Sequence, residues 1–139
     1  MKDTARFSET QSFAPFVYGI MGLSALTAVG VGLAWPLLLV ALTLNLLCLR
    51  TTLTDQELVI TFGALFPLYR RRIALTDIAS AEAVTYSPIA DYGGWGIKGR
   101  PGNSALNARG NRGVRLTLCN GKKLMIGSQK PEALAALLQ

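Results

Sequence analysis

A long run of uncharged, mostly apolar residues occupies the N-terminal part of the chain. The 34 residues from Phe16 to Leu49 include no Asp, Glu, Lys or Arg. One helix of that length would measure about 51 Å, whereas the hydrocarbon core of a bilayer is about 30 Å thick. Two helices joined by a turn fit better, and Gly30 and Pro36 lie where such a turn would fall. The pattern therefore predicts a transmembrane helical hairpin over residues 16–50.

A buried helical pair inside a globular domain is the alternative to this hairpin. We favour the hairpin because the rest of the 139-residue chain is too short to enclose two wholly apolar helices and also form a core of its own. Ser24, Ala28 and Gly32 recur at intervals of four, and such a stripe of small residues permits close helix packing. The packing partner would be the second helix of the same hairpin or a helix of another chain.

Basic residues flank the apolar tract on both sides. Lys2 and Arg6 precede it and Arg50 follows it directly, whereas the predicted turn carries no charge. Because positively charged flanks stay on the cytoplasmic side, both termini are expected in the cytoplasm. This interpretation divides the chain into a cytoplasmic N-terminal segment at 1–15, the hairpin at 16–50 and a further domain at 51–139.

Apolar and polar residues alternate beyond residue 50, as they do in strands that are buried on one face. The alternation predicts strands near residues 58–62, 68–75, 79–86, 103–109, 114–119 and 124–126. Asn120 and Gly121 form a typical two-residue hairpin turn between the last two strands. Pro131 opens a short amphipathic helix. The expected order is a run of antiparallel strands followed by one helix.

Several short motifs, combined with this order of elements, resemble a known bacterial family. The motifs are Leu53-Thr54-Asp55, Leu58-Val59-Ile60, Arg72-Ile73, Asp77-Ile78, Tyr92–Ile97, Asn111–Val114, Ile126–Gln129 and Pro131-Glu132. They resemble an uncharacterised branch of the bacterial pleckstrin-homology-like (PH-like) proteins, which carry two transmembrane helices before the domain. The resemblance implies a membrane-anchored α+β protein of the bacterial inner membrane. Its PH-like domain would be an antiparallel bent sheet or partly open barrel, capped by the C-terminal helix.

Three consecutive arginines form the first candidate binding site. Adjacent side chains of a strand point to opposite faces, so Arg70 and Arg72 are expected on one side and Arg71 on the other. Two guanidinium groups on one face can hold a lipid phosphate through bidentate hydrogen bonds. A specific inositol-phosphate site, general attraction to anionic lipid and a solvated strand face are the alternatives.

The loop Gly63–Pro67 is unusually apolar, because it contains Leu65 and Phe66. One interpretation is that these two side chains enter a lipid headgroup region or dock on a partner. The other is that the loop folds back over the open end of a small barrel.

Composition argues against most catalytic chemistry. The chain has no histidine, and Cys48 and Cys119 are far apart in sequence. Residues 94–99 match G-x-G-x-x-G, but no helix follows and no acidic residue stands about 20 positions later, as a dinucleotide site requires. We therefore expect no catalytic residues, no cofactor and no metal.

The net charge of +6 comes from the part of the chain that follows the apolar tract, and it suits an anionic partner without requiring nucleic acid. The first hypothesis is a non-catalytic integral membrane protein whose cytoplasmic domain mediates protein–protein interaction or assembly, with a membrane protein or a second copy as partner. The alternative is an anionic-phospholipid-binding module that uses Arg70 and Arg72. Neither nucleic acid nor a small-molecule substrate is expected.

Overall fold

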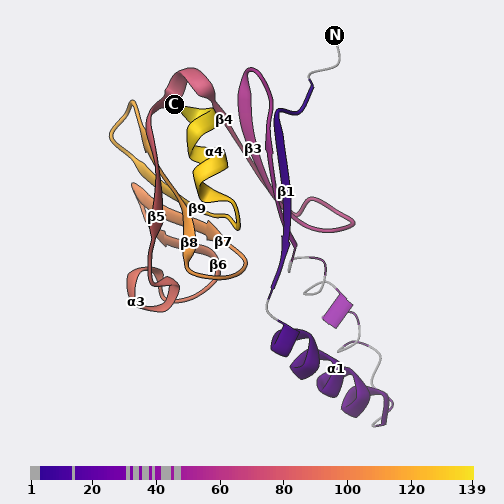
Figure 1. Cartoon of the computed structure of the whole chain (residues 1–139). Coiled ribbons are helices and arrows are strands. Elements are labelled where there is room, and N and C mark those ends of the chain that lie inside the picture. The colour runs from indigo at the N-terminus through magenta and orange to yellow at the C-terminus, as the bar shows by residue number, and fades with distance from the viewer. Residues whose placement is uncertain are drawn as a thin grey trace.

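The computed structural model describes residues 4–13, 15–30 and 48–139, together with residues 32, 35, 38, 40, 41 and 45. Its strands form two sheets that face each other (Figure 1). Sheet A has four strands in the order β1-β2-β3-β4, and sheet B has five in the order β5-β8-β9-β7-β6. The core lies between the two sheets, so each sheet also has an outer face.

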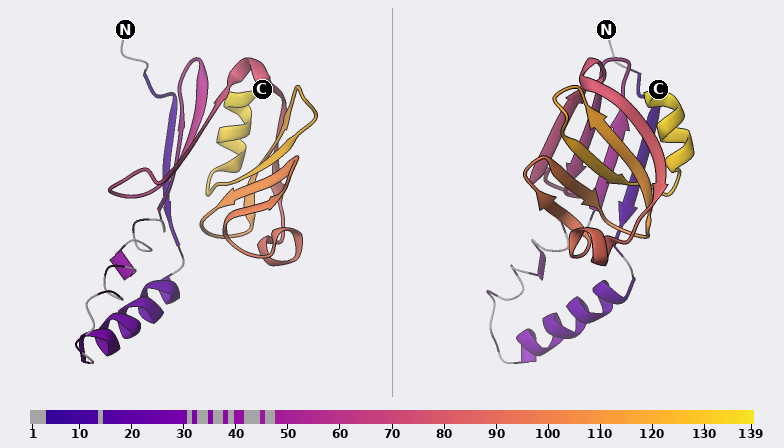
Figure 2. Two further views of the ribbon diagram at one scale, coloured as in Figure 1. Left: turned by 180° about the vertical axis from the view of Figure 1, so that it is seen from behind. Right: turned by 90° about the vertical axis from the view of Figure 1, so that its left-hand side faces the viewer.

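Sheet A is antiparallel throughout. Its strands are β1 (Phe7–Ser12), β2 (Cys48–Leu53), β3 (Glu57–Phe62) and β4 (Tyr69–Ala74). The pairing of β1 with β2 places Ser12 opposite Cys48, so the two ends of the apolar tract leave the sheet side by side. Helix α1 (Pro15–Gly30) extends beyond that end of the sheet (Figures 1 and 2).

Sheet B follows a short 3₁₀ turn, η1 (Leu75–Asp77). Its strands are β5 (Ile78–Thr85), β6 (Gly96–Arg100), β7 (Asn103–Asn107), β8 (Arg112–Leu118) and β9 (Lys123–Gly127). The pairing of β7 with β9 is parallel, and the other pairs are antiparallel. A hairpin at Asn120-Gly121 does join β8 to β9, but its loop is longer than the predicted two residues, because the Leu118 N–H donates to the Lys122 carbonyl and, of the two turn residues, only Gly121 has a positive φ.

Two further helices complete the domain. Helix α3 (Pro88–Tyr92) lies on the connection from β5 to β6, and α4 (Pro131–Leu138) follows β9. The helix predicted to begin at Pro131 is thus present, and it packs against β5 and β8 at one open side between the sheets (Figure 2). The largest buried side chains of this core are Leu49, Leu53, Leu58, Ile60, Phe62, Leu106, Val114, Leu116, Leu124, Ile126 and Leu134.

The transmembrane hairpin predicted over residues 16–50 is wrong. In the part of the chain that the structure describes, no helix is both long enough and apolar enough to cross a membrane. Helix α1 has 16 residues, which corresponds to about 24 Å, against a bilayer core of about 30 Å. Most of the second predicted helix falls outside the described residues. The assignment to the bacterial inner membrane with both termini cytoplasmic depended on that hairpin and is not supported.

The expected fold class is wrong as well. A membrane-anchored hairpin followed by one bent sheet or partly open barrel was expected, whereas the strands form two separate sheets with a few short helices. The split occurs at η1, because the next strand, β5, pairs with β8 instead of continuing from β4. The division of the chain at residues 15 and 50 stays a prediction, although β1 and β2 lie in one sheet.

Strand β1 was not predicted, and polar contacts hold it against the rest of the domain. The Glu9 carboxylate accepts hydrogen bonds from the Ser128 hydroxyl at 2.6 Å and from the Gln129 N–H at 2.7 Å. Gln11, which is buried, donates through Nε2 to the Gly127 carbonyl at 2.9 Å. These bonds join the edge of sheet A to the end of β9 and the segment before α4, and they satisfy the Glu9 carboxylate and the Gln11 Nε2 group, whereas the buried Gln11 Oε1 atom has no described partner.

Close backbone packing explains two of the glycines in the motifs above. A Cβ atom on Gly113 would lie 2.3 Å from the carbonyl oxygen of Ile126, on the neighbouring strand. A Cβ atom on Gly127 would lie 2.8 Å from the Cβ of Asn107. Both positions lie between paired strands and leave no room for a side chain.

We expect Gly113→Ala to lower the free energy of unfolding by about 1–3 kcal/mol, because the new methyl group must push β8 and β9 apart. The matched control is Gly22→Ala in α1, where nothing lies within 4 Å of the new atom. That change should shift stability by less than about 1 kcal/mol and in the favourable direction. Denaturant unfolding of the full chain, followed by circular dichroism, measures both. Equal stability of the two variants would contradict the packing argument.

Candidate functional site

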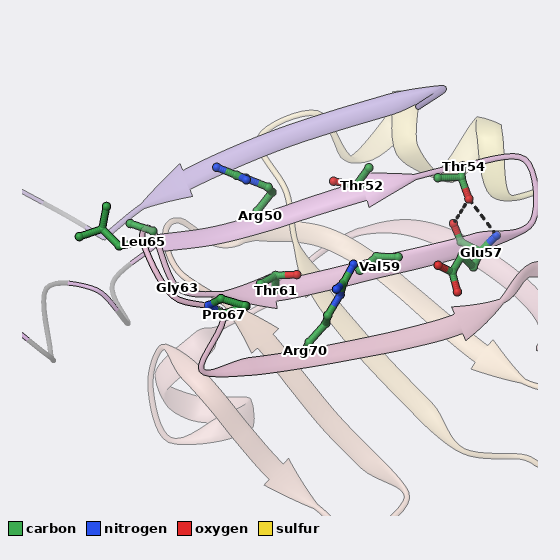
Figure 3. A pocket seen from close by; sticks show the side chains of 11 residues that line it. Arg50, Thr52, Thr54, Glu57, Val59, Thr61, Gly63, Leu65, Pro67 and Arg70 are labelled. Atoms are coloured by element: carbon green, nitrogen blue, oxygen red, sulfur yellow. Dashed lines mark hydrogen bonds between the residues drawn. The ribbon is translucent and has the colours of Figure 1, made fainter. Parts of the chain in front are cut away.

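The outer face of sheet A carries a groove of about 390 Å³ (Figure 3). Strands β2, β3 and β4 form its floor, and the loop from Gly63 to Pro67 forms one wall. The floor is rich in hydroxyl groups, since Thr52, Thr54 and Thr61 all line it. Most inward residues of these strands are apolar and fill the core, with Thr51 and the half-buried Arg71 as polar exceptions, and alternation along each strand places Arg50, Thr61 and Arg70 on the outer face.

Two arginines lie on either side of Thr61 in the groove. In the register of the sheet, Arg50 of β2 and Arg70 of β4 are both paired with Thr61 of β3. Neighbouring strands are about 4.8 Å apart, so the two arginine backbones are separated by about 10 Å. Both side chains are exposed, and Figure 3 shows Arg70 reaching over β3 beside Val59. The Arg50 side chain is directed toward β1 in the same view, so an anion above Thr61 would contact both guanidinium groups once Arg50 turns toward β3.

The predicted pair of Arg70 and Arg72 is only partly brought together. Both are exposed on the same face of β4, and Arg71 is half-buried on the other face, as the alternation required. Arg72, however, pairs with Val59, two residues along β3 from Thr61. It lines a separate groove with Arg71 and Asn120. The partner of Arg70 in the sheet A groove is therefore Arg50.

Arg50 was predicted only as a positive charge that flanks the apolar tract, and not as a binding residue. The signal that identifies it is the polar alternation of Arg50, Thr52 and Thr54, which places these three residues on one face of a strand. Leu49 and Leu53, which alternate with them, are buried. A predicted strand that began at Cys48 would have placed Arg50 on the same outer face as Thr52.

The positive end of the groove is not neutralised by a nearby carboxylate. Within the described residues, the ion pairs are Arg6 with Asp55 and Arg112 with Glu132. Glu57 lines the opposite end of the groove, four residues along β3 from Thr61, which is about 14 Å. The charges of Arg50 and Arg70 are thus available to a ligand.

The loop wall has a fixed conformation. Gly63 adopts φ +135°, and a Cβ atom there would lie 1.9 Å from the Phe66 carbonyl oxygen, so only glycine fits. Asn45, which is 8% exposed, accepts hydrogen bonds from the N–H groups of Leu65 (2.7 Å) and Phe66 (3.1 Å). Its Nδ2 donates to the Phe66 carbonyl at 2.9 Å. The Asn45 side chain therefore clamps the middle of the loop, at Leu65 and Phe66.

The clamp displays two large apolar side chains to solvent. Leu65 is 82% exposed and Phe66 is 69% exposed. The loop thus does not fold back over the core, whereas contact of Leu65 and Phe66 with lipid or a partner stays a prediction. Asn45, which lies within the predicted hairpin, holds this loop.

The predicted stripe of small residues is only partly described. Ser24 is exposed, and its hydroxyl donates to the Ile20 carbonyl of its own helix at 3.0 Å. Ala28 lies in α1, but its side chain falls outside the described residues, and Gly32 follows the end of the helix with φ +72°. Helix packing through Ser24, Ala28 and Gly32 stays a prediction.

Several large apolar side chains of α1 are exposed, namely Ile20, Leu23, Leu26 and Val29. They are spread around much of the helix circumference rather than gathered in one stripe. Among the described residues, no group of three or more His, Cys, Asp or Glu is placed to hold a metal ion.

Comparison with known proteins identifies no relative. No protein-family model matches the chain, and neither a curated protein nor a solved structure is similar to it. The resemblance to PH-like proteins with two N-terminal transmembrane helices is wrong, because no helix of the described residues is both long and apolar enough to span a bilayer, and no family model supports it. Its motifs Asn111–Val114 and Ile126–Gln129 have instead the structural roles described above, in strand packing and in holding β1.

We expect Asn45→Ala to speed amide hydrogen exchange at Leu65 and Phe66 by about tenfold, because each loses a hydrogen bond that contributes about 1–1.5 kcal/mol. Thr27→Ala is the control, because the Thr27 hydroxyl donates to the Ser24 carbonyl of its own helix, and this change should leave exchange at both amides unchanged. Hydrogen exchange followed by NMR measures the two amides directly. Unchanged exchange in the alanine variant would show that Asn45 does not hold the loop.

Proposed function

We propose that the chain is a non-catalytic binding protein that holds a phosphate-bearing ligand in the sheet A groove. The observation that supports this function is the placement of Arg50 and Arg70 on either side of Thr61, with no described carboxylate paired to either arginine. Guanidinium groups bind phosphate oxygens through paired hydrogen bonds, and a threonine hydroxyl adds a donor beneath them. The ligand would lie across β3.

The loop beside the groove favours a phosphate that is attached to an apolar group. Leu65 lines the groove itself, and Phe66 is the next residue of the same clamped loop. Exposed apolar side chains next to two cations suit an anionic phospholipid, whose headgroup would meet the arginines while its acyl part meets Leu65. A free phosphate would use the arginines and leave the loop without a role.

The first prediction of this proposal concerns vesicle binding. We expect Arg50→Gln with Arg70→Gln to weaken binding to vesicles containing anionic phospholipid by roughly 30-fold, at about 1 kcal/mol for each arginine. The control is Arg109→Gln with Lys122→Gln, which removes the same charge from exposed turns outside the groove. Co-sedimentation at fixed salt measures both variants.

Three outcomes of this experiment are distinct. Loss in the groove variant alone supports the proposal. Equal loss in both variants would mean that binding depends on net charge and would contradict a specific groove. Competition by soluble glycerol phosphate at equal strength would assign the site to free phosphate rather than to lipid.

Association between two copies of the chain is a second candidate function. The observation that favours it is the set of exposed side chains on α1, where Leu23 is 65% and Leu26 is 70% exposed. Large apolar side chains grouped on one element commonly mark an interface between proteins. A second copy offers an identical apolar helix, so the two helices would cover each other.

We expect Leu23→Glu with Leu26→Glu to prevent this association, because burying two carboxylates at a helix contact is strongly unfavourable. Analytical ultracentrifugation should show a concentration-dependent dimer for the parent chain and a monomer for this variant. Leu65→Glu is the control, since it changes an exposed leucine that lies on the groove loop instead of on α1. A monomeric parent chain at every concentration would exclude the second candidate.

A further inference from the structure

A second polar groove, of about 310 Å³, lies on the outer face of sheet B. Five residues line it: Asp91 and Tyr92 of α3, Asn103 of β7, Arg115 of β8 and Lys123 of β9. Val114 and Leu116, on either side of Arg115, are fully buried in the core, so Arg115 points outward. The groove is thus on the opposite side of the molecule from the one in sheet A.

Two cations of this groove come from neighbouring strands. Arg115 pairs with Met125 in the antiparallel register, and Lys123 is two residues from Met125 on the same face. Diagonal neighbours of this kind are about 7–8 Å apart. Neither cation forms an ion pair with any residue that the structure describes. An anion between them would relieve their mutual repulsion and would receive hydrogen bonds from both.

Neutral groups extend the set of donors. Asn103 is opposite Lys123 in the parallel pairing of β7 with β9. The Tyr92 hydroxyl donates to the Asn103 Oδ1 atom at 3.4 Å, which leaves the Asn103 amide nitrogen free to donate to a ligand. Burial raises the pKa of Tyr92 above its ordinary value, and the nearby charge of Arg115 opposes that rise in part.

Two carboxylates lie near these cations: Glu82 is opposite Arg115 in the pairing of β5 with β8 but forms no described ion pair with it, and Asp91, the one acidic residue that lines the groove, is already hydrogen-bonded. The Asp91 Oδ2 atom accepts a hydrogen bond from the Ser87 N–H at 2.8 Å, at the N-terminus of α3. Ser87 in turn caps the helix, because its hydroxyl accepts from the Ala90 N–H at 3.3 Å. The carboxylate therefore stabilises α3, and no ion pair joins it to either cation.

A small separate core holds this groove in place. Tyr86, Ala105 and Met125 are buried together on this side of sheet B, and Tyr92 packs against them. The rings of Tyr86 and Tyr92 meet edge to face with centroids 6.0 Å apart. Asn107 donates to the Tyr86 hydroxyl at 2.8 Å. Tyr92 is thus held in place at the groove before a ligand arrives, which reduces the entropy that this residue loses on binding.

We propose that the sheet B groove is a second binding site that takes a small phosphate, inorganic or as a monoester, between Arg115 and Lys123. The site is independent of the proposed function, because it shares no residue with the groove in sheet A. It also lacks exposed apolar residues of the kind that Leu65 supplies there. It therefore selects a soluble ligand rather than a lipid.

The test is titration of the full-length ¹⁵N-labelled chain with inorganic phosphate, followed by NMR at constant ionic strength. The amide signals of Asn103, Arg115 and Lys123 should shift and saturate. Arg115→Gln with Lys123→Gln should weaken this binding by about tenfold or more, whereas Arg50→Gln with Arg70→Gln should leave these shifts unchanged.

A second variant separates loss of phosphate binding from loss of folding. Asn103→Asp keeps the size of the side chain and places a carboxylate in the groove, so it should abolish phosphate binding while the remaining spectrum stays folded. Full binding by either sheet B variant would overturn the proposal. Equal shifts on titration with chloride at the same ionic strength would overturn it as well.

Discussion

The antiparallel pairing of β1 with β2 is the constraint on which the rest of the structure depends. Because Ser12 is opposite Cys48, the whole apolar tract must leave sheet A and return to it at the same end. That return places Asn45 beside the loop between β3 and β4, where it fixes the wall of the groove. The edge position of β1 is in turn held by Glu9, through its bonds to the segment before α4.

The arginines of β4 have a structural explanation that does not extend to Arg50. β4 is an edge strand, and charged side chains on an edge discourage pairing with another sheet. Arg50 lies on β2, between β1 and β3, where an edge needs no protection. Alternation along β2 places Arg50 on the outer face, and its position across Thr61 from Arg70 is the feature on which the proposed phosphate site rests.

Local sequence patterns predicted those elements whose stability is local. The Asn120-Gly121 turn and the helix at Pro131 follow from turn and helix-start preferences, and both are present. β1 was missed because its inward positions include Glu9 and Gln11, which are satisfied by partners more than 100 positions away in sequence. The predicted hairpin was wrong because an uncharged, apolar composition does not fix where a helix begins and ends, and α1 has only 16 residues.

The two grooves use the same electrostatic arrangement but differ in what surrounds it. Each takes two cations from separate strands of one sheet, on an outer face where the core does not restrict them. In sheet A the cations lie beside the exposed Leu65, whereas in sheet B they lie beside Tyr92 and Asn103. Because the sheets face in opposite directions, one small ligand cannot fill both sites (Figure 2). The surroundings of the charges, more than the charges themselves, then decide which phosphate each face would bind.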